Sequence, residues 1–451
     1  MEPITTSIRV VVDRKQPGYR TRFAIAYLAL FVLMGGDAVR YAIGWLGWGL
    51  LLGVLLVATL FNFFRADWKA TFKRIPWPLT GLLGIMAVGS IWSNYPIVSA
   101  GATLVQLATT SFALYLACCF DWREILRLFG NTLRVILYSS VLFELFAAVV
   151  VRGPIEPFFP NYAGDHPPAV AFYWTQGNLF TDDRIQGIVG NSNMLAYMAM
   201  IAFVVFAIER AANTTGRLVT ILSYSAAVPM LLLARSASIG FALLAVVAAA
   251  IVSIAAEGKT RDVRHRYYRI AWGVIGAGAL LVLTYRAQLF SLIGKSPDMT
   301  GRTKIWKVVL HLIDQRPFQG WGWTSYWVPW VEPYRGLVVI NHVPYFQAHN
   351  AFLDVWLQLG LVGLGLFILL IGMTFVRLWR LAVRHTSSLY LWPILVFVGI
   401  VTQNLTESRL LVEIGWVMLV LFAVKVGDPA DSLEPIGRSV KRSRIKRLAK
   451  R

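Results

Sequence analysis

Apolar stretches long enough to cross a lipid bilayer recur along almost the whole chain, and they restrict its fold more than any other feature. A transmembrane helix needs about 20 mainly apolar residues, because only helices and closed barrels satisfy the backbone polar groups within roughly 30 Å of hydrocarbon. The sequence predicts about twelve such helices, over residues 23–36, 41–64, 78–94, 99–120, 134–151, 185–208, 217–234, 236–256, 269–285, 351–376, 389–403 and 412–427. Hydrophobic residues make up 57% of the chain and charged residues 15%, which excludes a soluble globular, disordered or fibrous protein. We therefore expect an all-α polytopic membrane protein with a single integral membrane domain, residues 1–451.

The distribution of basic residues predicts how this bundle is oriented. The chain has 43 Lys and Arg against 23 Asp and Glu, a formal net charge of +20. With twelve spans, most of the basic residues fall on the face that carries both termini, which predicts that both termini are cytoplasmic. Residues 1–22 show no cleavable signal peptide, so the first span is expected to act as an uncleaved anchor. The basic tail, residues 428–451, is read as a topology signal in contact with anionic lipid rather than as a nucleic-acid binder.

Two long loops lie on the outer face in this topology. They cover residues 152–184 and 286–350, and the second is expected to fold into a small helical cap. Within it, residues 302–313 alternate basic and apolar faces at helical spacing, which predicts a helix in the plane of the lipid headgroups. For the four tryptophans that follow, an aromatic belt is favoured over stacking against sugars; they are Trp321, Trp323, Trp327 and Trp330. Because the polar residues gather in outward loops, the chain is expected to act on its outer face.

Arginines and small polar residues are predicted at the outward ends of two spans. Arg184 is expected to open the sixth span, ahead of Asn191 and Asn193, and Arg235 with Ser236 opens the eighth. Guanidinium groups beside helix N-termini suit a phosphate or diphosphate. Taken singly, each arginine is also explained by a side chain that reaches the interface. Arg235 is the hardest to explain in that way, because it lies in a tight turn between two apolar spans.

His349 is the sharpest single candidate for chemistry. His349-Asn350 opens the tenth span and is followed by Gly360 and Gly363. On a straight α-helix Gly360 would lie on nearly the same face as His349, where a neighbouring helix can pack closely. A neutral imidazole can take a proton from a hydroxyl, although a lone histidine here is more simply a capped interfacial residue.

A metal site is not favoured. Joining His349 with His342 and His311 gives no ligand spacing, and no carboxylate is grouped with them in the sequence. The two cysteines, Cys118 and Cys119, are adjacent inside an apolar run, so they offer neither a disulfide framework nor a zinc site. We expect neither a metal nor a cofactor.

The pattern of His349-Asn350, nine residues, Gly360, two residues and Gly363, after a long external loop, resembles the O-antigen ligases of Gram-negative bacteria. These belong to a larger group that includes the O-antigen polymerases. Further segments that resemble the family are Arg184…Gly187…Asn191-Ser192-Asn193, Arg235-Ser236 and Gly301-Arg302…Trp306. The motif-level similarity covers about residues 180–365, while the number of spans and the placement of the loops agree over the whole length.

The resemblance implies a GT-C-like, inverting, metal-independent glycosyltransferase of the bacterial inner membrane. It would move O-antigen polysaccharide from undecaprenyl diphosphate to a sugar hydroxyl of lipid A–core at the periplasmic face. The resemblance also implies roles for individual residues. They are His349 as general base, Arg235 and Arg302 as diphosphate binders, Arg184 as support, Asn191 and Asn193 as groups that orient sugar or phosphate, His342 as an alternative base, and Asp182 and Asp183 as reserve carboxylates.

Two other functions stay open at this point. An O-antigen polymerase uses a similar donor, and the sequence separates it poorly from a ligase. A secondary transporter is disfavoured, because transporters usually show repeats and ionisable groups at the midplane. Here the ionisable residues gather at one surface and no internal repeat is visible.

Overall fold

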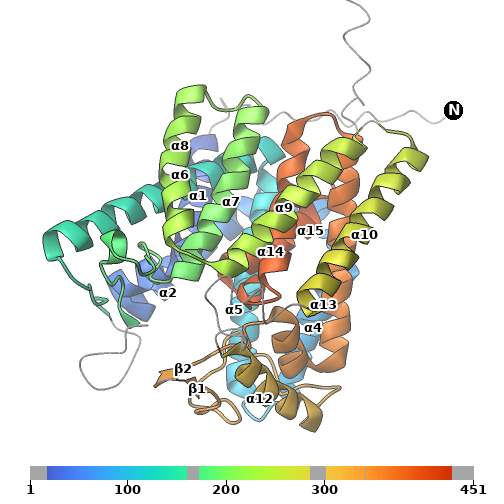
Figure 1. The fold of residues 1–451 in the computed structure, drawn as a ribbon. Helices are drawn as coiled ribbons and strands as arrows, with labels where there is room; N and C mark the ends of the chain where they lie inside the picture. The colour runs from blue at the N-terminus through green and yellow to red at the C-terminus, as the bar shows by residue number, and fades with distance from the viewer. Residues whose placement is uncertain (1–17, 160–171, 258, 285–300, 341, 429–451) are drawn as a thin grey trace, which may run out of the picture.

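The computed structural model describes residues 18–159, 172–257, 259–284, 301–340 and 342–428. Across these ranges the chain is a bundle of long helices with a small irregular region at one end (Figure 1). The α-helices are α1 (Tyr19–Met34), α2 (Gly36–Phe64), α3 (Trp68–Phe72), α4 (Trp77–Val88), α5 (Pro96–Cys119), α6 (Trp122–Leu145), α7 (Ser192–Ala211), α8 (Arg217–Leu233), α9 (Ala237–Ala256), α10 (Arg261–Thr284), α12 (Arg302–Gln315), α13 (Ala351–Arg384), α14 (Leu391–Gln403) and α15 (Glu413–Lys425). Shorter elements are η1 (Gly89–Ile91), the π-helical η2 (Phe146–Val151), η4 (Asn178–Phe180), η5 (Ser388–Tyr390), η6 (Arg409–Leu411), and the strands β1 (Val339–Ile340) and β2 (Val343–Pro344).

Each predicted span falls on one of these helices, and six of them are long and apolar enough to cross a membrane. The six are Gly36–Phe64, Pro96–Cys119, Trp122–Val151, Ser192–Ala211, Ala237–Ala256 and Ala351–Arg384. Three shorter apolar helices lie at Trp77–Ile91, Arg217–Leu233 and Ser388–Gln403. The chain therefore fits a polytopic helical membrane protein, while the count of twelve spans stays a prediction. Most of the tail 428–451, the first part of the loop 286–350 and residues 160–171 lie outside the described residues.

Apolar side chains line both the inside and the outside of the bundle, as a bilayer requires. Of the most apolar 18-residue stretch in α7, 78% is buried inside the bundle, whereas for the corresponding stretch in α2 the buried share is 17%. Around α7 and α15 the core contains large side chains such as Trp392, Trp416 and Phe422. On the outside, Leu46 and Val54 of α2 are exposed. A helix that is apolar on every face, such as α2, fits lipid on one side and protein on the other.

Two helix boundaries differ from the predicted spans for identifiable reasons. The helix predicted from residue 134 begins at Trp122, because Asp121 and Glu124 form a capping box there. The arginines that marked residues 122–133 as a loop lie on an amphipathic helix whose apolar face is buried. In the sixth span the helix begins at Ser192 instead of residue 185.

The described part of the second long loop forms α12 and the β1–β2 hairpin, which lie together at one end of the bundle (Figure 1). The two strands pair antiparallel, with Val339 opposite Pro344 and Ile340 opposite Val343. The apolar face of α12 packs into a second core against α13. This face, with Ile305 and Val309 fully buried, is covered by protein, so the expected helix in the headgroup plane is wrong.

Three of the four tryptophans after α12 are core residues. Trp321, Trp323 and Trp327 are buried, with Trp323 in the main core and the other two in the second core, whereas Trp330 is exposed. An aromatic belt and sugar stacking both require exposed rings. Both explanations therefore fail for the first three and remain available only for Trp330.

Helix α13 is broken at Gly360, which has φ 67°. The broken turn hydrogen-bonds to the loop after α12: Trp321 N donates to Leu357 O at 3.0 Å, Gly322 N to Gln358 O at 2.9 Å, and Leu361 N to Pro317 O at 2.9 Å. A Cβ on Gly360 would lie 1.9 Å from the Phe318 carbonyl oxygen. The straight helix expected from His349 to Gly360 is therefore wrong, and this glycine admits a loop backbone instead of a neighbouring helix.

Candidate active site

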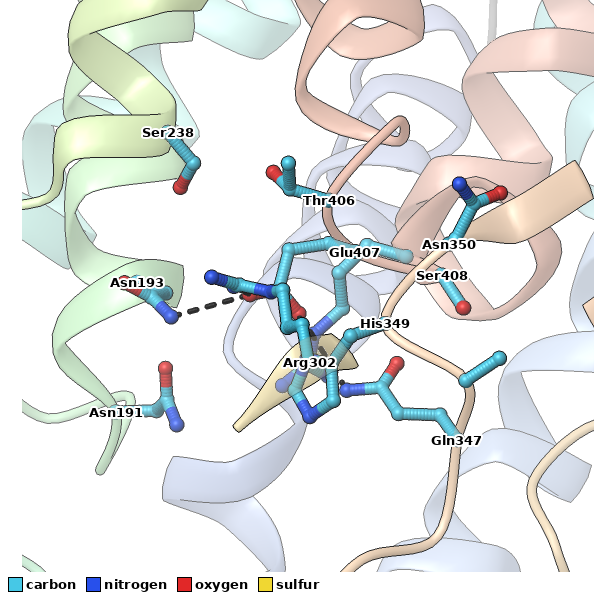
Figure 2. A network of polar contacts seen from close by, with 12 residues as sticks. Asn191, Asn193, Ser238, Arg302, Gln347, His349, Asn350, Thr406, Glu407 and Ser408 are labelled. Atoms are coloured by element: carbon cyan, nitrogen blue, oxygen red, sulfur yellow. Dashed lines mark hydrogen bonds and ion pairs between the residues drawn. The ribbon is translucent and has the colours of Figure 1, made fainter. Parts of the chain in front are cut away.

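The candidate site is organised around one buried carboxylate, Glu407, in the short segment between α14 and η6. Its side chain accepts hydrogen bonds from His349 Nδ1 at 2.9 Å, Arg302 Nη2 at 2.8 Å and Asn193 Nδ2 at 3.1 Å. Gln347 Nε2 lies 3.5 Å from the same carboxylate. Figure 2 shows these side chains converging on Glu407 from separate parts of the chain. The fold thus gathers residues from the start of α7, the start of α12 and the segment before α13 at one point.

The ionisation state of Glu407 sets the tautomer of His349. Burial raises the pKa of Glu407, but His349 and the Arg302 and Arg409 guanidinium groups outweigh it and lower that pKa to about 2. Glu407 is therefore ionised at neutral pH and can only accept hydrogen bonds. The Nδ1 atom of His349 must then carry the proton that it donates to Glu407. In the neutral ring this leaves Nε2 with a free lone pair, which can accept a proton.

A second buried carboxylate, Asp354, connects the segments on either side of this pair. It accepts hydrogen bonds from Ala348 N at 2.9 Å and from the Ser408 hydroxyl. Ala348 precedes His349, and Ser408 follows Glu407. Trp327 Nε1 also donates to Asp354, at 2.8 Å. Asp354 is therefore a positioning residue that fixes the backbone beside both members of the pair.

Backbone contacts strengthen this connection. Ala351 N donates to Asn404 O at 3.0 Å, and Asn350 Nδ2 donates to Leu405 O at 3.1 Å. Asn350 also caps α13, since its Oδ1 accepts from the backbone N–H groups of Phe352 and Leu353. His349 itself has φ 50°, a left-handed conformation that these contacts maintain. The imidazole is thus presented by a segment with little freedom to rotate.

We expect Asp354→Asn to lower the melting temperature of the purified protein. An asparagine has the shape of the aspartate, but an NH₂ group, which cannot accept a hydrogen bond, replaces one of the two oxygens. At least one of the buried donors Ala348 N, Trp327 Nε1 and Ser408 Oγ then loses its acceptor, which costs about 1–3 kcal/mol. Asp314→Asn, at an exposed position on α12, is the matched control and should melt like the wild type. Equal melting temperatures for Asp354→Asn and the wild type would show that the connection is not needed.

Asn193 links Glu407 to Arg184. Its Oδ1 accepts from Arg184 Nη2 at 2.6 Å and from Ser236 Oγ at 3.0 Å, while its Nδ2 donates to Glu407. Arg184 Nε also donates to Ala234 O at 2.9 Å. The structure therefore brings Arg184, Asn193, Arg302 and His349 into one network, as the shared role expected of them requires.

Arg184 and Asn191 are placed differently from the expectation. Arg184 does not open a helix, because Gly187 and Gly190 turn the chain at φ 61° and 62° before α7 begins. Asn191 is the N-cap of α7, and its Oδ1 accepts from Met194 N at 3.1 Å. Its carbonyl is therefore engaged in capping, which leaves its amide nitrogen for a ligand.

Arg235 lies at the exposed edge of the network and makes no described contact with Glu407. Its guanidinium contacts the Asp182 backbone oxygen and lies 3.6 Å from the Asp182 carboxylate, with 45% of the Arg235 side chain exposed. The next residue, Ser236, contacts Asn193. Asp183 accepts from the backbone N–H of Arg184 at 2.7 Å. No described contact joins either aspartate to His349.

His342 and His311 are separate from the site in the part of the chain that the structure describes. His342 is exposed in the turn between β1 and β2, and His311 is exposed on α12. No described hydrogen bond joins either ring to Glu407. Among the described residues, no group of three or more His, Cys, Asp and Glu could hold a metal ion.

A polar pocket of about 250 Å³ adjoins the network and shares Arg184 and Asn193 with it. The other lining residues are Gln176, Asp183, Gln186, Asn191 and Ser192. Drug-sized ligand pockets run from roughly 300 to 1,000 Å³. A pocket of this size and polarity suits a single phosphate or sugar unit, while the rest of a long substrate would extend beyond it.

The sequence interpretation missed Glu407, Asp354 and Ser408, and the expectation that no carboxylate is grouped with His349 is wrong. The missing signal was available in Thr406-Glu407-Ser408-Arg409, a polar run between two apolar spans. A charged residue beside a membrane span is a functional candidate by default. The run lies in the short connection between the predicted spans 389–403 and 412–427.

A comparison with known protein families matches part of the chain. Residues 221–368 match the family model described as O-antigen ligase. The match covers about a third of the chain and supports an assignment to the O-antigen ligase family. The matched stretch includes Arg235, Arg302 and His349, whereas Arg184, Asn193 and Glu407 lie outside it. A comparison with curated proteins finds no match to the chain.

Proposed function

We propose that this protein is a glycosyltransferase that moves O-antigen polysaccharide from undecaprenyl diphosphate to a sugar hydroxyl of lipid A–core. The observation that carries the proposal is the hydrogen bond of 2.9 Å between His349 Nδ1 and the ionised Glu407, within a network that also holds two arginines. The family assignment supports a lipid-linked polysaccharide as donor. The GT-C-like architecture and the inverting course belong to the same proposal.

The chemistry follows from the tautomer of His349. Glu407 holds the Nδ1 proton, so Nε2 accepts the proton of the acceptor hydroxyl as its oxygen attacks the anomeric carbon. A new carbon–oxygen bond forms on one face of that carbon while the bond to the diphosphate oxygen breaks on the opposite face, so the configuration inverts. The electron pair of the broken bond leaves on the diphosphate. The imidazolium formed is stabilised by Glu407 until it loses its proton.

The arginines stabilise the leaving diphosphate. Arg302 and Arg184 place two positive charges within the network, where Arg302 pairs with Glu407 and Arg184 lies near both Glu407 and Asp183. Arg235 adds a third at the exposed edge, 3.6 Å from the Asp182 carboxylate. Guanidinium groups bind phosphate oxygens bidentately and stabilise developing negative charge without a metal ion. Asn191 and Asn193 contribute amide groups toward sugar or phosphate in the adjoining pocket.

The proposed setting is the periplasmic face of the bacterial inner membrane, with both termini cytoplasmic. Supporting this, the described parts of both predicted external loops contribute to the site end, through Arg184 from the first and Arg302 and His349 from the second. The basic stretches near residues 65–74 and 377–384 lie where α2 and α13 end, away from the site. This distribution agrees with the positive-inside rule.

The direct test uses purified protein, polysaccharide on undecaprenyl diphosphate, and lipid A–core, with a chelator present. We expect lipid A–core to gain the polysaccharide, seen as a shift to high mass on gels. Growth of the polymer on its lipid carrier without transfer to lipid A–core would instead identify a polymerase. Substrate movement across liposomes coupled to an ion gradient, without transfer, would identify a transporter.

Arg235→Lys is expected to reduce the rate of transfer at least tenfold. A lysine keeps the positive charge but loses the planar fork that binds a phosphate through two hydrogen bonds. The initial rate of transfer to lipid A–core, compared with wild type, is the measurement. Arg210→Lys, near the opposite end of α7, is the control and should leave the rate unchanged. A normal rate for Arg235→Lys would remove the fork geometry from the mechanism.

A further inference from the structure

A second pocket lies at the end of the bundle opposite to Glu407. It has a volume of about 670 Å³ and is formed by the link between α3 and α4, the later part of α13 and Gly427, two residues after the end of α15. The direction of two helices, α13 and α15, places the pocket at this end of the bundle. Both α13 and α15 begin beside the Glu407 segment. The pocket is lined by Met373 and Arg377, in the later part of α13, and by Gly427, just beyond α15, so the two sites lie toward opposite ends of the bundle.

The pocket has more basic side chains than carboxylates that pair with them. Lys73, Arg74 and Arg377 line it. Arg74 Nη1 lies 3.0 Å from Asp428, and Lys425 Nζ lies 3.0 Å from the same carboxylate. Asp428 is therefore shared by two cations. Within the described ranges, Lys73 and Arg377 make no ion pair, so an anion in the pocket would meet two side chains that have no carboxylate partner there.

Apolar side chains complete the lining. Ile75, Trp77 and Met373 share the pocket with the three cations. Trp77 is 61% exposed and Phe72, just before the link, is 47% exposed. Tryptophan is favoured at the level of lipid headgroups, where its ring meets both apolar and polar surroundings. The pocket therefore offers a charged part for an anion and an apolar part that continues onto the outer surface of the bundle.

We propose that this pocket binds the headgroup phosphate of an anionic phospholipid in the leaflet opposite to the Glu407 site. Lys73 and Arg377 contact the phosphate, Arg74 is held at its edge by Asp428, and Trp77 and Met373 contact the start of the acyl chains. Basic pockets between transmembrane helices are suited to such headgroups. A topology signal alone would need the charges but not the cavity or its apolar wall.

The test is native mass spectrometry of the full chain released from detergent micelles with phosphatidylglycerol or phosphatidylcholine added. We expect wild type to retain phosphatidylglycerol in preference to phosphatidylcholine. Lys73→Gln/Arg377→Gln should weaken the retention of phosphatidylglycerol by roughly 10- to 30-fold, given the contribution expected of two basic residues near an anionic surface. Intact mass and melting temperature show whether this variant is folded.

The matched control is Arg380→Gln/Arg384→Gln, which removes two charges from the same helix outside the pocket. We expect this control to retain phosphatidylglycerol like wild type. Equal losses in both double variants would mean that the lipid follows net charge, and the proposal would be wrong. It would also be wrong if inorganic phosphate at millimolar concentration displaced the lipid completely, because the pocket would then be a site for free anions.

Discussion

We expect Glu407→Gln to lower the rate of transfer by about 10⁴-fold, the loss associated with removing the carboxylate that orients a catalytic histidine. A glutamine keeps the shape of Glu407 but carries no charge, so it no longer fixes the Nδ1 proton of His349. It also removes the ion pair between Glu407 and Arg302. The single-turnover rate of transfer to lipid A–core is the measurement. Glu332→Gln, an exposed position in the same external region, is the control.

The pH dependence of stability separates the electrostatic part of this effect from a loss of packing. The pKa of Glu407 is about 2 in the folded protein, below the ordinary value of about 4.3. A carboxyl group whose pKa is lowered by folding stabilises the protein at pH values above its pKa in the unfolded chain. This stabilisation is lost as the pH falls toward its pKa in the folded protein. The difference in melting temperature between wild type and Glu407→Gln should therefore be largest at pH 7 and become smaller below about pH 4. A difference that is constant down to pH 2, or a normal transfer rate, would contradict the role of Glu407.

We expect His349→Ala to abolish transfer to lipid A–core while the protein is still expressed and still binds the lipid-diphosphate donor. The variant removes the nitrogen that accepts the hydroxyl proton, and general base catalysis is worth about 10²- to 10⁴-fold. Donor binding rests on the arginines, so a binding assay with the diphosphate donor should change little. Transfer rate and donor affinity, measured on the same preparation, test both parts.

His342→Ala and His311→Ala are the matched controls for this second variant. Both rings are exposed and make no described contact with Glu407, so both variants should transfer at the wild-type rate. Full activity in His349→Ala together with loss in His342→Ala would reverse the assignment of the base. Loss of donor binding in His349→Ala would place His349 in binding rather than in catalysis.

Most helices could be predicted from the sequence because apolar run length is a local property. Where the prediction failed, one cause was a local contact between side chains and the other was a nonlocal packing contact. The helix boundary at Trp122 depends on a capping box whose two side chains are three residues apart, which a count of charges does not register. The burial of Trp321 and Trp327 depends on α12 folding back against α13, and nothing in the spacing of these tryptophans separates a core from a membrane belt.

The candidate site was predictable where its residues lie in local sequence motifs, and not where they meet through packing. Arg302 and His349 lie in motifs that the family resemblance singles out, and the structure joins them through Glu407. The carboxylate itself follows the resembling segments in the sequence, 58 positions after His349. Its meeting with His349 is set by the packing of the Asn404 and Asn350 segments. No spacing rule along the chain reports such a meeting.

The break at Gly360 divides α13 into two parts with different attachments. The part before the break hydrogen-bonds to the loop after α12 through Leu357 and Gln358, and it packs in the second core through Leu357. Ala351, Val355 and Leu359 of the same part lie in the main core. His349 is therefore held between the external region and the bundle, so a displacement of the external region on taking up a bulky saccharide would move the imidazole only by also disturbing the contacts of α13 with the main core.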